Sequence, residues 1–582
     1  MRFATRIILA FLLPAVVLAE DVPAAKTGVF VGADAGGNWT ALETWKSQDG
    51  AAPKRIPGDG DTVTINGSVT VDAAVTVGTG AGDAIVVSKG SKLVVSAALT
   101  VKGSIKCAGQ PEIEVQPGGG IELDGAAGVT PTIHAEYGSA LHLYFRGAEA
   151  KRCFLRTKPG TAGNPGEVIG GNSVPLNVGA TCADFSDLGS KTAFGLNVAP
   201  SKDARMAALD RCTFTRANIK VVANAGEFTL SDCIFTDTTL YKLGDLNIGA
   251  HLSSNANLLS VVGCSFDKLV WPDRLKEVRS TVFYGNFYFN PYTAPAFLDW
   301  SENLAVVLEP SSGFVKTRPG THLRSYWICP VPDANNPHIL AAAGTTVFDQ
   351  CIWDVPLSVF VDDAILLIGR EQKDVTVRRC LSLPRMAGKR PGCGVSLGFV
   401  GAPDVRYQHN VIFLGVSAGI NSDVQHGGVP GSIVDFRNNI LCMLDSVPNE
   451  TGHVFGTDFK DLVSAAACDF NTLWRSDYGK LSLTEGKPGA HDVAADPKFV
   501  DPARNLVTFY RRSPGVRADT AEKDLVAALD WIRRNPRKMG ELIDWVFAGF
   551  VPTNPSLKAA SDPDGPTKGW IGAMEGAAAA PK

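Results

Sequence analysis

Short runs of alternating apolar and polar residues recur along the middle of the chain, and each leads into a cysteine or an asparagine. Examples are VTVRRCLSL, VRYQHNVIFL and IVDFRNNILC, whose apolar positions are mostly β-branched or aromatic. Such runs are typical of short strands, and no apolar stripe of helical period occurs between residues 60 and 510. The recurring positions are Cys212, Cys233, Cys264, Asn286, Cys329, Cys351, Cys380, Asn410, Asn439 and Asn471.

Most of these positions lie 21 to 32 residues apart, and one gap of 43 residues, from Asn286 to Cys329, predicts an insertion. One coil of short strands cannot bury its inner face alone, so coils stack into a solenoid with a continuous core. The pattern therefore predicts an all-β protein, a parallel β-helix whose coils lie about 4.8 Å apart. We expect the cysteines and asparagines to superimpose as a ladder. An asparagine can bond to its neighbour's amide and tolerate a left-handed turn, and a cysteine fits the same niche as a small hydrophobe.

The segments VRYQHNVIFLGVSAGI and IVDFRNNILC, with ADPKFVDPARNLVTFYRRSPGVRA (495–518) and WIGAME (570–575), carry a family resemblance. Over residues 200–575 the chain resembles secreted bacterial right-handed parallel β-helix proteins of the pectate-lyase-like superfamily. The resemblance implies a right-handed solenoid and a role with carbohydrates. It implies nothing finer, because that superfamily includes pectinolytic and alginate lyases, glycoside hydrolases, epimerases and non-catalytic adhesins.

The two ends of the chain differ from the repeats. Residues 31–125 hold Trp39, Trp45 and strands such as TVTI, SVTVD and KLVVS, and are similar to a β-rich module of the G8 type. We expect this module to cap the open end of the solenoid, with the two tryptophans in its core rather than as a sugar platform. Residues 521–550 have the helical pattern, interrupted by Pro536, and predict two short helices over the C-terminal end; a helix that binds a partner is the alternative.

The first residues predict export. Arg2 and Arg6 precede the apolar run IILAFLLPAVVLA, which ends at Ala19 and is too short to span a bilayer. We expect a cleaved signal peptide and a secreted, periplasmic or cell-surface protein; an uncleaved anchor is the alternative. The predicted organisation is a signal peptide (1–19), a linker (20–30), the N-terminal module (31–125), the β-helix (126–518) and the helical cap and tail (519–582).

The composition of the chain limits the kinds of binding partner and ligand that we expect. The 582 residues carry a net charge of −4, which gives no reason to expect nucleic acid, and no segment predicts a membrane span. A capped solenoid closes its own core, so we expect a monomer. The chain has 12 cysteines but no C-x-x-C, which argues against a metal site. A disulfide is the alternative for the cysteines off the predicted ladder, namely Cys107, Cys153, Cys182, Cys393, Cys442 and Cys468.

Candidate chemistry lies on six strands that follow the ladder bends and are predicted to line one outer groove: 246–254, 304–312, 365–372, 394–401, 419–428 and 453–460. If these strands align, Arg370, Asp423 and Asp458 fall near one line, with His426 just beyond. Asp423 and Asp458 would suit a glycoside hydrolase, which needs two carboxyl groups.

A lyase would instead use Arg370 to neutralise a uronate, with His426 or Lys460 as the base. Asn421 and Lys460 are the candidate substrate-binding residues.

We therefore expect an exported enzyme, a lyase or a hydrolase, that cleaves a polysaccharide. The alternative is a non-catalytic surface or matrix protein, in which the same side chains only face solvent. The string QHGG (425–428) departs from the polygalacturonase pattern. No cofactor and no metal are predicted for the site. Calcium is a candidate ligand only at Asp362, Asp363 or the DPDG turn (562–565), where hard oxygen ligands gather.

Overall fold

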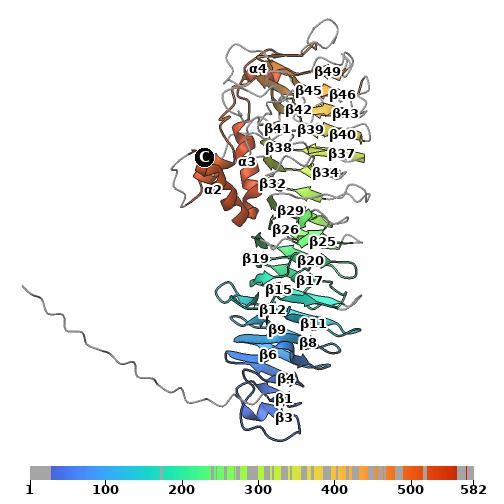
Figure 1. The fold of residues 1–582 in the computed structure, drawn as a ribbon. Helices are drawn as coiled ribbons and strands as arrows, with labels where there is room; N and C mark the ends of the chain where they lie inside the picture. Colours follow the sequence, from blue (N-terminus) through green and yellow to red (C-terminus); the bar gives the residue numbers. More distant parts are fainter. Residues whose placement is uncertain are drawn as a thin grey trace, which may run out of the picture.

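The computed structural model describes residues 28–170, 175–237, 489–514, 521–559 and Gly572, and between residues 241 and 478 it describes the strands and bends of the coils without most connecting loops. These residues form a right-handed parallel β-helix, a long column of stacked coils with a group of helices against one side (Figure 1). The predicted fold class is confirmed.

Sheet 1 is formed by the strands that precede the ladder bend, and every pairing within it is parallel. Its strands are β2 (Gly37–Asn38), β5 (Ser68–Val71), β7 (Lys92–Val95), β9 (Glu112–Val115), β12 (Leu141–Arg146), β15 (Leu176–Thr181), β18 (Ala208–Asp210), β21 (Phe228–Ser231), β26 (Leu259–Val262), β29 (Glu277–Arg279), β31 (Asp299–Ser301), β34 (Gly320–Leu323), β37 (Gly344–Asp349), β40 (Gln372–Arg378), β43 (Val405–Gln408), β46 (Ile433–Arg437) and β49 (Cys468–Asp469).

Sheet 2 follows the bend. Its strands are β10 (Gly120–Asp124), β13 (Cys153–Thr157), β16 (Ala183–Leu188), β19 (Thr213–Ala217), β22 (Ile234–Thr236), β27 (Ser265–Asp267), β30 (Val282–Tyr284), β32 (Leu304–Val306), β35 (Tyr326–Ile328), β38 (Ile352–Asp354), β41 (Leu381–Ser382), β44 (Val411–Leu414), β47 (Ile440–Met443) and β50 (Thr472–Trp474).

Sheet 3 completes the coils of the N-terminal half: β1 (Val29–Gly32), β4 (Thr62–Ile65), β11 (Thr132–Ala135), β14 (Glu167–Ile169), β17 (Leu196–Val198), β20 (Ile219–Val222), β25 (Ala250–Ser253) and β28 (Leu269–Val270). The long strands β6 (Val75–Val87) and β8 (Ala98–Cys107) join it to sheet 2, because β8 pairs first with β10 and then with β11. Residue 125 is the predicted boundary between the N-terminal module and the β-helix. Pairing continues across it, from β8 through β10 to β13, so the strands on both sides belong to one sheet.

Further along the chain a five-stranded parallel sheet contains β33 (Val315–Lys316), β36 (Ile339–Leu340), β39 (Ala364–Ile368), β42 (Val395–Val400) and β45 (Ala418–Ser422). The remaining strands form three small pairings: β3 (Trp45–Ser47) against β1, β23 (Tyr241–Leu243) with β24 (Leu246–Ile248), and β48 (Gly452–His453) with β51 (Ser476–Asp477). Trp39 and Trp45 are buried in the first coils, with their rings edge to face at 4.7 Å.

The predicted ladder exists, with corrections. The strand registers align one residue per coil directly before or at the start of each sheet 2 strand, in the order Cys153, Ala183, Cys212, Cys233, Cys264, Thr281, Asn303, Ser325, Cys351, Cys380, Asn410, Asn439 and Asn471. Asn286 and Cys329 lie outside the described residues, and their predicted rungs are wrong because Thr281, Asn303 and Ser325 occupy these places. The predicted insertion is therefore wrong too, and Cys153, expected off the ladder, is on it.

From the Ala183 rung onward, the left-handed residue of the bend is the one before the ladder position, and not the ladder residue itself. Arg211 (φ 51°), Glu302 (φ 55°), His409 (φ 55°) and Asn438 (φ 58°) are examples. A side chain in this conformation is strained, and here the strain recurs coil after coil. The ladder residue can then point inward to its neighbours.

Amide rungs and thiol rungs bond differently. Asn439 accepts from the backbone N–H of Asn410 at 3.0 Å and donates to the carbonyl of Tyr407 at 3.0 Å, so one side chain satisfies two backbone groups of the preceding coil. A thiol forms weaker hydrogen bonds, such as the one that Cys233 donates to the carbonyl of Leu209 at 3.2 Å. Burial raises the pKa of Cys233, so the thiol stays protonated. All ten cysteines that the structure describes are free, which leaves no disulfide among them.

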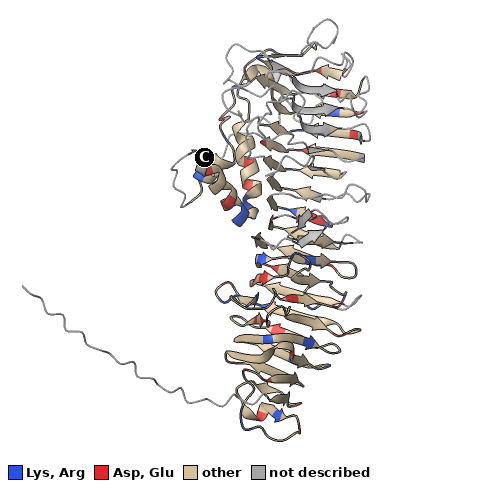
Figure 2. Ribbon diagram, in the orientation of Figure 1, with Lys and Arg blue, Asp and Glu red and all other residues tan. Residues whose placement is uncertain are grey.

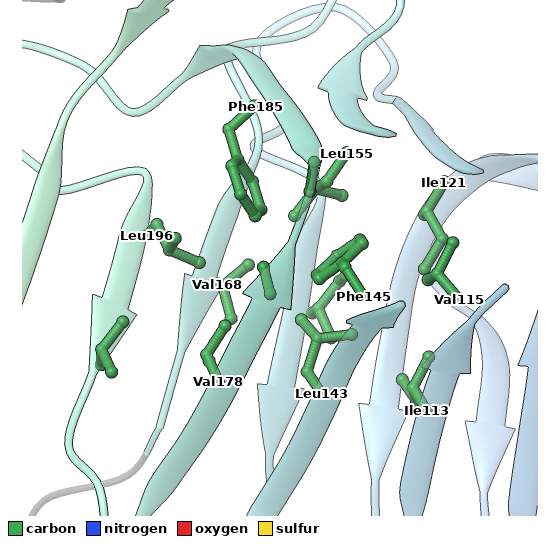
Figure 3. Close-up of a cluster of buried hydrophobic side chains, with 14 of the residues drawn as sticks. Ile113, Val115, Ile121, Leu143, Phe145, Leu155, Val168, Val178, Phe185 and Leu196 are labelled. Atoms are coloured by element: carbon green, nitrogen blue, oxygen red, sulfur yellow. The ribbon is translucent and has the colours of Figure 1, made fainter. Parts of the chain in front are cut away.

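The core of the column is a continuous stack of side chains. Figure 3 shows one part of it, where Ile113 of β9, Leu143 and Phe145 of β12 and Phe185 of β16 lie in the interior between the sheets. Further along the column come stacked rings, one per coil, with centroids 4.8 Å apart for Phe185 and Phe214, 4.3 Å for Phe214 and Phe235 and 4.7 Å for Phe235 and Phe266. The parallel register dictates this stacking, because it places the same position of each coil above the last.

The predicted helices form, and they cover the side of the column rather than its end. They are α1 (Leu506–Arg511), α2 (Ala521–Arg534), α3 (Met539–Gly549) and α4 (Pro555–Ala559), with a 3₁₀ turn, η5 (Pro536–Lys538). Figure 1 shows α2 and α3 beside β32 and β38. Apolar residues of α1 to α4 share one buried cluster with outward residues of sheet 2 from Val282 to Cys442. We call these helices the helical layer.

Candidate functional site

Most of the site residues predicted from the sequence lie outside the described residues. This holds for Arg370, Asp423, His426, Asp458 and Lys460, and also for the calcium candidates Asp362, Asp363 and residues 562–565. Asn421 lies in β45, where its backbone pairs with Phe399 of β42.

The six predicted groove strands do not form one surface. β39, β42 and β45 are neighbours in one parallel sheet, as the prediction of a shared groove requires for these three strands. β25 belongs to sheet 3 and β32 to sheet 2, where the helical layer covers it. The prediction of a single six-strand groove is wrong because β32 is buried on both faces.

The described residues hold a polar cluster on the outer face of sheet 1, which we call the β9–β12 cluster. Alternation in the strand sequences EIEV and LHLYFR turns every second side chain outward. The register then aligns Lys92 of β7, Glu112 of β9, His142 of β12 and Asn177 of β15 in one row across four coils. The cluster contains Lys92, Glu112, Glu114, His142, Tyr144, Arg146 and Asn177, together with Arg205 from the segment that crosses the face.

Three cations surround two carboxylates in this cluster. Lys92 Nζ lies 2.9 Å from Glu112 and 2.5 Å from Glu114, Arg146 lies 3.1 Å from Glu114, and Arg205 lies 2.6 Å from Glu112. Burial acts to raise the pKa of Glu114, but the hydrogen bond from Lys92 and the charges of Lys92 and Arg146 outweigh it, so this pKa is lowered. Glu114 is therefore ionised at neutral pH. Arg146 and Arg205 keep 45% and 68% of their side chains exposed.

The ring of His142 is held through Nδ1. The amide nitrogen of Asn177 can only donate, and it lies 3.3 Å from Nδ1, so Nδ1 is an acceptor and the proton is on Nε2. The hydroxyl of Tyr144 also contacts Nδ1, at 3.2 Å. Burial lowers the pKa of His142, so the ring is neutral at neutral pH. A neutral ring held in this way is a hydrogen-bond donor at Nε2.

A glycine brings the segment around Arg205 onto the sheet. A Cβ at Gly179 would lie 2.3 Å from the Cβ of Met206, so only glycine lets this segment pack so closely. The backbone N–H of Arg205 then donates to the hydroxyl of Tyr144 at 3.4 Å, and Asn177 accepts from the N–H of Ser201 at 2.8 Å. The cluster thus presents guanidinium, ammonium and imidazole donors above two carboxylates that are already bonded.

A second polar group lies on sheet 3. Thr132 Oγ1 lies 2.9 Å from His134 Nδ1, and His134 Nε2 lies 3.7 Å from Asp83. Burial raises the pKa of Glu167 on the next coil, as the acid of a hydrolase requires. In register, however, Glu167 lies beside Thr132 on one side and Gly195 on the other, so neither neighbour supplies a second carboxylate.

The β9–β12 cluster was not predicted from the sequence. Its signal was the alternation of charged and apolar residues in EIEV and LHLYFR, which we assigned only to a capping module and the start of the solenoid. The approach of Arg205 to Glu112 had no such signal, because it joins residues 93 positions apart.

No group of three or more histidine, cysteine, aspartate or glutamate side chains within the described part of the chain could hold a metal ion. Among the helices described, none is both long and apolar enough to cross a bilayer. Comparisons of the chain with protein-family models, with curated proteins and with solved structures gave no match.

Proposed function

We propose that the protein is an exported β-helix that binds an acidic polysaccharide along the outer face of sheet 1 and cleaves it. The observation that carries the proposal is the β9–β12 cluster, where three cations and the Nε2–H of His142 face outward on adjacent coils. A uronate polymer offers carboxylates to the guanidinium groups and ring oxygens to the imidazole.

The cluster suits binding better than catalysis. Glu114 is held ionised, so it cannot protonate a leaving group, and Nδ1 of His142 is already an acceptor for Asn177 and Tyr144. We therefore assign cleavage to Arg370, Asp423, His426 and Asp458, the set predicted from the sequence. An acidic substrate favours a lyase over a hydrolase, because Arg370 would neutralise the uronate while His426 or Lys460 takes the proton next to it.

The first experiment is a binding measurement with the full mature protein, using polygalacturonate, alginate and a neutral glucan. We expect binding to the acidic polymers that weakens with salt, and a loss of about tenfold in affinity in the double variant R146Q/R205Q, since each guanidinium makes charge-assisted bonds. Arg216→Gln, an exposed arginine on sheet 2 paired with Asp187, is the matched control. Equal binding of the neutral glucan would overturn the proposal.

Cleavage is read separately, as unsaturated-uronide absorbance for a lyase and as reducing ends alone for a hydrolase. We expect Asp423→Asn or His426→Gln to lower product formation at least a hundredfold, as for a general acid or base, without changing the affinity. Binding without any product would favour the second candidate, a non-catalytic surface or matrix protein.

A further inference from the structure

The helical layer contains a pocket on the side of the column. Its volume is about 520 Å³, and its lining includes Arg512, Trp531, Lys538, Glu541, Asp544 and Trp545. This volume lies within the range of ordinary small-molecule sites, roughly 300–1,000 Å³. The pocket is separate from the β9–β12 cluster, because the helices pack on sheet 2 and the cluster lies on sheet 1.

The charges of the pocket do not cancel. Glu541 pairs with Lys538 at 2.6 Å, and Asp544 pairs with Arg324 of the column at 2.9 Å. Arg512 has no carboxylate partner among the residues that the structure describes, and its guanidinium stacks on the ring of Trp545 at 4.0 Å. The pocket therefore presents one unmatched cation, held in place by an aromatic face.

The two tryptophans differ in availability. Arg504 stacks on Trp545 at 3.8 Å and Arg512 at 4.0 Å, so the two guanidinium groups occupy both faces of that ring. Trp531 meets Phe509 edge to face at 6.0 Å and stays half-buried, with its ring on the pocket wall. Trp531 is thus the ring on which an apolar ligand face can lie.

We infer that this pocket binds a carboxylated sugar, with the carboxylate on Arg512, an apolar pyranose face on Trp531 and hydroxyl groups donating to Glu541 and Asp544. A ligand with several phosphates fits poorly, because the carboxylates of Glu541 and Asp544 also line the pocket and would repel it. A purely apolar ligand would leave the guanidinium of Arg512 desolvated and unpaired. This inference goes beyond the proposed function, since it assigns a second site on another face and does not depend on cleavage.

The test uses trigalacturonate as the probe and maltotriose as its neutral counterpart, with isothermal titration calorimetry on the full mature protein. The background is the R146Q/R205Q variant, so that the β9–β12 cluster contributes little. We expect binding of trigalacturonate and at least tenfold weaker binding of maltotriose, from the loss of a charge-assisted pair. Arg512→Gln should reduce the affinity for trigalacturonate about tenfold and leave the affinity for maltotriose unchanged.

Controls separate the site from a general effect of charge or folding. Arg534→Gln removes an exposed arginine of α2 that does not line the pocket, and it should leave binding unchanged. Trp531→Ala should weaken both sugars, and Trp531→Phe, which keeps a ring and the fold, should restore most of the affinity. The inference is wrong if Arg512→Gln binds trigalacturonate like the parent, if both sugars bind equally, or if neither binds at millimolar concentration.

Discussion

Sheet 2 has two regions that differ in what covers their outer face. In the lower region, from β10 to β22, buried and partly exposed residues alternate, as in β13 and β19, and the outward side chains such as Arg156 and Thr215 meet water. In the upper region, from β30 to β47, nearly every residue is buried, as in β35, β44 and β47. A strand that is apolar on both faces needs a second layer, and here the helical layer supplies it.

Ion pairs join the helical layer to the column at the border between the two regions of sheet 2. Arg537 of η5 pairs with Asp232 at 2.7 Å, next to the lower region, and Arg533 of α2 pairs with Asp267 of β27. Figure 2 shows Lys and Arg gathered at the end of the helical layer that points toward the N-terminal half. The coils therefore carry their own core along the whole column, whereas the outer apolar cluster depends on the helices.

Truncating a ring of the lower stack should have the largest effect. Phe235 is fully buried between Phe214 and Phe266, so Phe235→Ala should lower the free energy of unfolding by about 3–5 kcal/mol through the cavity it leaves. Urea unfolding followed by circular dichroism measures it, with Thr229→Ala, partly exposed on β21, as the control. A loss below about 1 kcal/mol would mean that the coils do not depend on their inner stack.

The amide rungs should matter more than the thiol rungs. Asn439→Ala removes the partners of Asn410 N–H and the Tyr407 carbonyl, which should cost about 2–4 kcal/mol, in the lower part of the range set by two buried unsatisfied groups at about 1–3 kcal/mol each. Cys233→Ala loses only a small side chain and one weak donor, so about 1 kcal/mol is expected. Both are measured by urea unfolding, and equal losses would contradict this distinction.

Detaching the helical layer should affect the upper region alone. Arg533→Gln removes the pair with Asp267 and the stacking on Tyr284 at 4.2 Å, for an expected loss of about 1–2 kcal/mol. Hydrogen exchange should rise in α2, α3 and β30 and stay unchanged in β13 and β19. Arg534→Gln is the matched control. A rise spread equally over both regions of sheet 2 would show that they are not independent.

The smallest expected effect lies at the first coil and depends on pH. Burial acts to raise the pKa of Asp61, but hydrogen bonds from Arg55 and from the N–H groups of Gly58 and Gly28 outweigh it and lower this pKa. A lowered carboxyl pKa stabilises the fold above the unfolded value of about 3.9, and this stability is lost as the pH falls through the folded pKa. Hydrogen exchange of β1 and β4 between pH 6 and pH 2.5 measures it, and Asp61→Asn should remove the dependence.

The sequence determined the repeat, because the strand pattern and the small ladder residues are local and recur with each coil. It predicted the fold class, the ladder positions Cys212, Cys233 and Cys264 and those from Cys351 to Asn471, and the helices near the C-terminus. The sequence also indicated which part of sheet 2 is covered by a second layer. Covered strands have unbroken apolar runs such as VIFL and ILCM, and uncovered strands alternate, as in TFT, although we did not use that signal.

Which distant residues come into contact follows from the tertiary structure and not from local sequence. The rungs at Thr281 and Ser325 carry neither cysteine nor asparagine, so register alone identifies them. The β9–β12 cluster joins Glu112 to Arg205, and the pocket joins α1, α2 and α3 at the side of the column. Local residue types set the strands and bends, since each coil repeats the same succession of short strand, left-handed bend and short strand. The contacts between coils, loops and helices depend on the whole stack, because register and loop length bring them together.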